Sequence, residues 1–317
     1  MAKGKEEFTV AFYNLENYFD TRNDPHSLDD DFTPNGFKKW NDKKFLWKTR
    51  KLAKAISQIG KEETGELPVL VGVAEVENAS VLDALLATDA LKETNYSYVH
   101  FDSPDERGID TGLIYHKDFF EVIASETLPL LIENTNGDRD FTRDILYVHG
   151  ALNGEEMHIF VNHWPSRRDG AKETEYKRIA AAETILEKMN TLDVGIEEAH
   201  LIVMGDFNDD PQSESIQRLM HSKAFINPME KLLSPIMGSA NYKGEWSLFD
   251  QVLFSHNFLN IEKGTHSFKK AAIFSPRFLK EWKGKYKGNP YRTYAGRKYI
   301  GGYSDHFPVY AIFSYSS

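Results

Sequence analysis

Several apolar, strand-like segments of this chain end abruptly in carboxylate, amide or imidazole groups. Residues 203–208 have the sequence VMGDFN, and residues 302–308 have the sequence GYSDHFP. A polar group at the end of a buried strand is costly to desolvate unless it is hydrogen-bonded or binds a cation. In α/β proteins, ligand sites lie beyond the ends of the strands. The pattern therefore predicts a sheet-containing fold with a ligand site at its strand ends.

Polar residues recur at such strand ends along nearly the whole chain. They are Asn14, Glu75, Asp110, Asn162, His163, Asp206, Asn208, Asp250, Asp305 and His306. Their donor atoms are oxygens and imidazole nitrogens, and the chain contains no cysteine. Such a donor set favours Mg²⁺, with Mn²⁺ as the alternative, over a structural zinc ion.

Hydrophobic periodicity predicts a mixture of strands and helices. The expected helices cover residues 40–59, 80–90 and 173–189. The expected strands cover residues 8–13, 68–74, 96–100, 111–116, 145–152, 157–162, 201–205, 248–254 and 309–313. Many consecutive strands have no helix between them, which favours two packed sheets with outer helices over a doubly wound sheet.

The sequence predicts one domain over residues 1–317, because no Pro/Gly/Ser-rich linker divides the chain. Residues 20–39 and 255–303 lack periodicity, and irregular stretches of that length are usually functional. No apolar run approaches the roughly 20 residues that span a bilayer, and the N-terminus lacks the apolar core of a signal peptide. We expect a soluble monomer, and the sequence leaves its compartment open.

The formal net charge is −10. This charge argues against a protein that coats nucleic acid non-specifically. It does not exclude a nuclease, because a carboxylate-rich site recruits cations first and the local potential then changes sign.

In order and spacing, the polar strand ends resemble the endonuclease/exonuclease/phosphatase superfamily, which has the DNase I-like fold. The matching segments contain Asn14, Glu75, His163, Asp206, Asp250 and Asp305. The variants NLEN, EVEN and NHWPS are similar to those of an uncharacterised bacterial branch of that superfamily. The resemblance implies an α/β four-layer sandwich, in which two packed mixed β-sheets are flanked by helices.

The resemblance also implies roles for individual residues. Asn14, Glu75 and Asp305 would hold the divalent ion. Glu77 is left open between a surface acid and a further ligand. Asp206 and Asn208 would position the attacking water, since residues two apart in an extended segment share a face.

Two histidines would move protons in such a site. Asp250 would pair with His306, because a neighbouring carboxylate favours the protonated ring and fixes its tautomer. His163 would be the general acid for the leaving oxygen, with Asp110 orienting it. The choice of Asp206 or His306 as the base stays open.

Basic residues suggest where phosphate would bind. Arg143 and Arg167 are the preferred pair to grip a phosphate group bidentately. Residues 278–299 interleave lysines and arginines with tyrosines and tryptophan, a composition that suits a nucleic-acid strand. The alternative is a structured loop whose tyrosines pack inward.

The leading hypothesis is a Mg²⁺-dependent phosphodiesterase, specifically a nuclease, that uses in-line attack by water. The alternative is a metal-dependent phosphatase of small phosphorylated compounds, such as a nucleotide, a phospholipid headgroup or an inositol phosphate. A catalytically inactive scaffold is disfavoured, because every polar position of the set is present.

Overall fold

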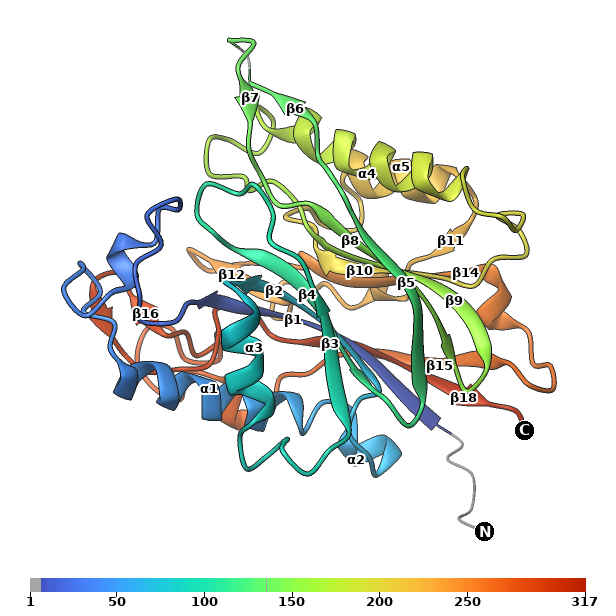
Figure 1. Ribbon diagram of the computed structural model, residues 1–317, viewed down its shortest axis with the longest axis horizontal. Coiled ribbons are helices and arrows are strands. Elements are labelled where there is room, and N and C mark those ends of the chain that lie inside the picture. The colour runs from blue at the N-terminus through green and yellow to red at the C-terminus, as the bar shows by residue number, and fades with distance from the viewer. Residues whose placement is uncertain (1–6, 135) are drawn as a thin grey trace.

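The computed structural model describes residues 7–134 and 136–317, and two six-stranded sheets dominate it (Figure 1). The first sheet contains, in spatial order, β15 (His266–Ile273), β18 (Val309–Tyr315), β1 (Glu7–Tyr18), β2 (Leu70–Val76), β4 (Asp110–His116) and β3 (Tyr96–His100). The second contains β11 (Phe225–Ile226), β14 (Asp250–Ser255), β10 (Leu201–Asp206), β9 (Glu155–His163), β8 (Ile145–Leu152) and β5 (Phe120–Leu128).

Five α-helices, four short 3-10 helices and three small hairpins complete the regular structure of the described residues. The α-helices are α1 (Asp42–Ile56), α2 (Lys61–Thr64), α3 (Ala79–Leu86), α4 (Glu175–Met189) and α5 (Glu214–His221). The 3-10 helices are η1 (Asp30–Phe32), η2 (Pro228–Lys231), η3 (His256–Leu259) and η4 (Arg277–Leu279). The hairpin strands are β6 (Ile132–Glu133) with β7 (Arg139–Asp140), β12 (Ala240–Tyr242) with β13 (Glu245–Ser247), and β16 (Tyr294–Ala295) with β17 (Lys298–Tyr299). None of these helices has the length and apolar character needed to cross a bilayer.

Each large sheet is mixed, with one parallel pair near its middle. The strands β1 and β2 run parallel, as do β9 and β10, and the other neighbours in both sheets are antiparallel. The carboxyl ends of a parallel pair lie at the same sheet edge, and an antiparallel neighbour begins there. In each sheet, several strand ends and strand starts therefore lie close together at one edge.

The two sheets pack face to face, and helices cover their outer faces. Between the sheets, Phe12 of β1 packs with Met204 of β10 and Phe254 of β14 in one buried cluster. Gly72 of β2 allows this approach, because a Cβ there would lie 2.6 Å from the sulfur of Met204. The helices α1 and α3 cover the first sheet and α4 and α5 the second (Figure 1). The four-layer sandwich predicted from the sequence is confirmed.

Several elements were not predicted from the sequence, among them two long edge strands and the helix α5. Residues 255–303, expected to be irregular, contain β15, and the strand β5 was not expected at all. Both strands lie at sheet edges, where many side chains are exposed and apolar alternation is weak. The helix α5 is only eight residues long, too short for a clear periodic signal.

A buried carboxylate joins the two sheets at the edge away from the strand ends described below. Glu155 of β9 accepts a hydrogen bond from the backbone N–H of His266 on β15, and it also contacts the ring of His266. The Nε2 of His200 lies 2.9 Å from the other carboxylate oxygen. Burial alone would raise the pKa of Glu155, but these two imidazoles lower it to about 2.

We expect Glu155→Gln to destabilise the protein at neutral pH. The pKa of Glu155 falls from an ordinary 4.5 to about 2 on folding, which corresponds to roughly 3 kcal/mol at about 1.36 kcal/mol per unit. This contribution is present above about pH 4.5 and is lost as the pH falls towards 2. Thermal unfolding across this pH range should therefore show a smaller acid-induced fall in Tm for Glu155→Gln than for the wild type. The exposed neighbour Glu156→Gln is the matched control, and an equal effect of both changes would contradict the assignment.

Candidate active site

The predicted site residues lie together at the strand ends that the two sheets bring together. In the second sheet, His163, Asp206 and Asp250 stand side by side on β9, β10 and β14, with Asp206 paired to each of the others. In the first sheet, Asn14 of β1 pairs with Ala74, directly before Glu75 of β2. The segment before β18 joins them, since the hydroxyl of Ser304 donates to the carbonyl oxygen of Asn14 at 2.6 Å.

The carboxylate oxygen Oδ2 of Asp206 is the point on which the site converges. The Nδ2 of Asn14 donates a hydrogen bond to it at 2.9 Å. The Nε2 atoms of His163 and His306 lie 3.7 and 3.8 Å from it, respectively. Asp206 is only 2% exposed, and burial raises its pKa to about 6, with His306 lowering that value and Asp250 raising it. The structure thus places one buried carboxylate among groups from both sheets.

A bulge in β2 turns Glu75 towards this centre. The pairing register shifts between Ala74 and Val76, and Glu75 has a φ of 60°. A positive φ is unfavourable for a residue other than glycine and is tolerated mainly at functional sites. Its Oε2 accepts the N–H of Asn17 at 2.6 Å, and its Oε1 lies 3.9 Å from Nε2 of His163.

Close packing of β9 against β10 fixes the strand end that carries His163. A Cβ on Gly205 would lie 2.4 Å from the carbonyl oxygen of Asn162, so only glycine fits there. The buried amide of Asn162 donates to Met204 and accepts the indole N–H of Trp164 at 3.0 Å. The segment from Asn162 to Trp164 is therefore a rigid support, and Asn162 is structural in this arrangement.

His306 forms the pair with Asp250 that the sequence predicted. The Nδ1 of His306 lies 2.6 Å from Oδ2 of Asp250, which is fully buried. Burial alone would lower the pKa of His306, but the carboxylates of Asp250 and Asp206 raise it well above 6.5. This ring therefore carries a positive charge at neutral pH.

His163 has the opposite electrostatic environment. Burial, together with the positive charges of Arg143 and Arg107, lowers its pKa well below 6.5. Its Nδ1 is buried and has no hydrogen-bond partner among the described residues. His163 is consequently a neutral imidazole.

Asp110 was predicted to orient His163, and its contacts in this structure are with other residues. One oxygen of Asp110 accepts the backbone N–H of Ser103 at 2.9 Å, and the other lies 3.5 Å from Nε2 of His100. The carboxylate starts β4, where it pairs in register with Val76 rather than reaching β9.

Asn208 also differs from its prediction, because it is not extended. The strand β10 ends at Asp206, and Asn208 has a φ of 49°. Its backbone N–H donates to Oδ1 of Asp206 at 2.9 Å, and its Nδ2 donates to the carbonyl oxygen of Trp164 at 3.0 Å. Asn208 therefore fixes the orientation of the Asp206 carboxylate instead of sharing its face.

The two arginines predicted to grip phosphate are both occupied by internal partners. Arg143 pairs with the buried Asp105 at 3.0 Å and donates to the carbonyl oxygen of Trp164 at 2.9 Å. Arg167 donates to Asp209 at 2.5 Å and to the carbonyl oxygen of Asn208. Their guanidinium groups stabilise the loops, and the predicted phosphate-binding role of this pair stays a prediction.

Two other arginines lie beside the site. The sequence gives Arg107 no role there, whereas Arg292 belongs to residues 278–299, whose composition suits a nucleic-acid strand. Arg107 donates to Oδ1 of Asn17 at 2.7 Å and lies 3.7 Å from Glu75. Arg292 donates to Oδ2 of Asp305. Their side chains are 41% and 44% exposed, which leaves donor groups accessible to a ligand. The only sequence signal for Arg107 is its place in the loop that leads to Asp110.

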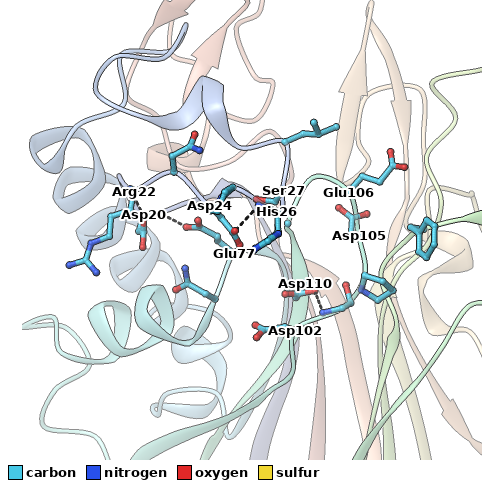
Figure 2. Close-up of a pocket in the computed structure, with 18 residues that line it drawn as sticks. Asp20, Arg22, Asp24, His26, Ser27, Glu77, Asp102, Asp105, Glu106 and Asp110 are labelled. Atoms are coloured by element: carbon cyan, nitrogen blue, oxygen red, sulfur yellow. Dashed lines mark hydrogen bonds between the residues drawn. The ribbon is translucent and has the colours of Figure 1, made fainter.

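Further buried ionisable groups surround the centre. Burial and the neighbouring Asp305 raise the pKa of Glu16 to about 7, although Lys48 and Arg292 oppose this. Glu77, which the sequence left open, accepts the N–H of Asp20 and lines the neighbouring cleft shown in Figure 2. Burial raises the pKa of Glu77 to about 8.

The donor set fits a divalent cation. Burial and, to a smaller extent, the neighbouring carboxylates of Asp305 and Asp250 raise the pKa values of Glu16 and Asp206. In addition, Oδ1 of Asp250 is buried without a hydrogen-bond partner among the described residues. Asp206, Asp250 and His306 offer ligand atoms that all lie within 4.8 Å of one another. Of the predicted ligands, Asn14 and Glu75 are adjacent, with 3.5 Å between Nδ2 and Oε1, whereas Asp305 is bound by Arg292.

Comparison with known families and structures agrees with this geometry. The model described as Endonuclease/Exonuclease/phosphatase family matches residues 9–314. An endonuclease/exonuclease/phosphatase family protein from Bacteroides thetaiotaomicron is 20% identical, with 98% of this chain and 95% of that chain covered and a TM-score of 0.60. A mannosyl-6-phosphatase from the same organism is 19% identical, with 96% and 99% covered and a TM-score of 0.59.

A third similar structure is D. rerio TDP2 complexed with a single strand DNA product. It is 15% identical, with 97% of this chain and 98% of that chain covered and a TM-score of 0.58. At these identities the structural likeness shows the fold, which agrees with the predicted DNase I-like sandwich. A comparison with curated proteins gave no match.

The different surroundings of Arg143 and Arg107 predict different effects on stability. Arg143→Ala would leave the buried carboxylate of Asp105 without its cation, and we expect a loss of about 3–5 kcal/mol in the free energy of unfolding. Arg107→Ala removes a half-exposed side chain and should cost less than about 1 kcal/mol. Urea unfolding of both variants measures the difference. Equal losses would contradict the separation of a structural arginine from an accessible one.

Proposed function

Because this chain belongs to the endonuclease/exonuclease/phosphatase family, we propose that it is a Mg²⁺-dependent phosphodiesterase that hydrolyses nucleic acid. The family makes the chain a phosphoric ester hydrolase. The proposal adds the ion, with Mn²⁺ as the alternative, the class of ester and the roles of individual residues. It also assigns the reaction to a single in-line attack by water.

One observation carries the proposal: Asn14, His163 and His306 converge on a single oxygen of Asp206. Hydrolysis of a phosphodiester needs an oriented water, stabilisation of the phosphoryl oxygens and help for the leaving oxygen. The carboxylate of Asp206 could orient the water, and the imidazoles of His306 and His163 could contact the phosphoryl oxygens and the leaving oxygen, respectively. The geometry therefore supports in-line attack with Asp206 at the water.

The electrostatics favour Asp206 over His306 as the base. His306 already carries a proton beside Asp250, so its ring is suited to hold a phosphoryl oxygen by a charge-assisted hydrogen bond. The pKa of Asp206 is about 6, and a base is most effective when its pKa lies near the working pH. Asp206 would take the proton of the water.

His163 would act on the leaving oxygen. Its ring is neutral, so it would donate the hydrogen bond of Nε2 rather than a proton held in advance. Its Nδ1 is buried and has no partner among the described residues, so the ring would act through its Nε2–H alone.

Asn14, Glu75 and Asp305 are the residues that we propose hold the divalent ion, which would neutralise the charge developing on the phosphoryl oxygens. Asn14 is neutral and does not repel phosphate, while the two acids supply anionic oxygens. Arg107 and Arg292 stand beside these acids. They replace Arg143 and Arg167 as the proposed contacts for substrate phosphate.

A nucleic-acid substrate is supported by residues 278–299. Trp282 and Tyr286 are 63% and 54% exposed, and Nζ of Lys283 lies 4.2 Å from the ring centre of Trp282. Exposed aromatic rings beside lysines suit stacked bases and a phosphate backbone. Tyr294, in contrast, is buried. The alternative of a structured loop with inward-packing tyrosines therefore applies to part of residues 278–299 only.

A small phosphorylated substrate is the second candidate. Seven of the 18 residues that line the cleft beside the site are acidic (Figure 2), and their carboxylates would repel a long polyanion on that side. A similar fold occurs in a mannosyl-6-phosphatase. These observations favour a compact phosphate ester over a duplex that covers the whole face.

Hydrolysis of three substrates in Mg²⁺ tests the proposal: supercoiled plasmid, bis-p-nitrophenyl phosphate and p-nitrophenyl phosphate. We expect plasmid nicking and diester cleavage, both lost in an Asp206→Asn variant. His163→Ala should lower turnover by roughly 10²–10³, the scale for removal of one hydrogen-bond donor to a developing negative charge. The exposed His256→Ala is the matched control. Cleavage of the monoester alone would replace the nuclease by a small-molecule phosphatase.

The lysines of the exposed segment predict the salt dependence of binding. Replacing Lys285 and Lys287, both exposed, with Gln should weaken single-strand DNA binding. The slope of log affinity against log salt should become shallower by roughly 0.7 for each lost phosphate contact. Fluorescence anisotropy in a salt series measures this slope. The matched control replaces the exposed Lys263 and Lys269, and an equal change in both double variants would contradict a local strand-binding surface.

A further inference from the structure

A cleft of about 950 Å³ lies beside the catalytic centre (Figure 2). It is bounded by residues 20–28 on one side and by the loop between β3 and β4, residues 101–109, on the other. Its lining includes Asp24, Glu77, Asp102, Asp105, Glu106 and Asp110. None of these residues has a role in the proposed chemistry, so the concentration of acids here needs a separate explanation.

Three residues at the base of the β3–β4 loop form a compact ligand set. His100 ends β3, Asp102 follows it, and Asp110 begins β4. Each residue offers one ligand atom, and these three atoms all lie within 4.8 Å of one another. Figure 2 shows Asp102 and Asp110 close together at one end of the cleft.

The environment of the His100 ring is a second observation that indicates a bound ligand, and it does not depend on the acids. Its side chain is only 4% exposed, and its Nε2 is buried without a hydrogen-bond partner among the described residues. The distance from this Nε2 to Oδ2 of Asp110 is 3.5 Å, beyond the usual hydrogen bond of about 2.9 Å. Two ligands of one tetrahedral ion at about 2.1 Å would be roughly 3.4 Å apart.

Asp110 is held in the orientation that such a site requires. Its Oδ1 accepts the backbone N–H of Ser103 at 2.9 Å, so Oδ2 is the oxygen that faces His100. Outer partners of this kind orient the ligands of metal sites in proteins. The carboxylate is nearly fully buried, and burial of a charge is favourable only when it is paired or binds a cation.

We propose that His100, Asp102 and Asp110 bind a second divalent cation outside the catalytic centre. One imidazole with two carboxylates suits a transition ion such as Zn²⁺ or Mn²⁺ better than Mg²⁺, which prefers oxygen ligands alone.

The second site would act on the position of Arg107. The three ligands lie at the two ends of the loop that carries Arg107, and this side chain contacts Asn17 and Glu75. A cation bound across the base of the loop would restrict it and thereby hold Arg107 beside the centre. Asp110 also pairs with Val76, next to the bulge of Glu75.

Counting bound Mn²⁺ by calorimetry on metal-stripped protein tests the proposal. We expect two Mn²⁺ per chain in the wild type, one in His100→Ala, and one in the double variant Glu75→Gln/Asp305→Asn. The ion that remains in the double variant should disappear when His100→Ala is added. A wild-type count in His100→Ala, or no bound ion in the double variant, would overturn the second site. This readout does not depend on activity, so it is separate from a failure of the proposed function.

Variants on the exposed side of the site guard against a folding defect in His100→Ala. Asp102 is exposed, so Asp102→Asn should leave the circular dichroism spectrum unchanged. It should weaken the second Mn²⁺ by at least about tenfold, a loss that even outer partners of a metal site can cause. Glu106→Gln is the matched control, since Glu106 is exposed and lines the same cleft outside the ligand set. Equal weakening in both variants would show diffuse attraction by acids and would reject the coordination site.

Discussion

The burial of Asp206 is the constraint on which the rest of the site depends. A carboxylate that is 2% exposed must be hydrogen-bonded or neutralised, because desolvation of an unpaired charge costs several kcal/mol. Asn14 from the first sheet and the backbone N–H of Asn208 supply the hydrogen bonds, and His306 supplies a positive charge. The two sheets must therefore pack in one relative position, and the pairing of β9, β10 and β14 sets the remaining side chains around this carboxylate.

The two histidines of the site differ in charge because they differ in neighbours. His306 is placed against the carboxylate of Asp250, which together with Asp206 outweighs burial and raises its pKa. For His163, burial is the largest effect, and the positive charges of Arg143 and Arg107 lower its pKa further. The carboxylate of Asp206 therefore lies between two different rings. The charged ring of His306 is suited to phosphoryl oxygens, and the neutral ring of His163 is suited to the leaving oxygen.

The internal partners of Arg143 and Arg167 have a physical reason. Both arginines are near the motifs in sequence, but buried acids compete for their guanidinium groups. Asp105 and Asp209 are both buried, and Arg143 pairs with Asp105 while Arg167 and Arg178 pair with Asp209. The sequence gives Arg107 no role, because nothing in a sequence shows which side chains remain half-exposed beside a site. Asp110 likewise contacts Ser103 and His100, two neighbours in the loop that it closes.

The sandwich of two sheets, most of its strands and the set of polar residues that end them can be predicted from the sequence alone. These features are local, because apolar periodicity and a change to polar residues are encoded within a few positions. The bulge at Glu75, the left-handed turn at Asn208 and the partner of each charged group depend on the folded chain. A charged side chain pairs with the opposite charge that the packing brings near it, and that neighbour is distant in sequence. Asp250 and His306 are in contact because β14 and the segment before β18 reach the same edge of the sandwich.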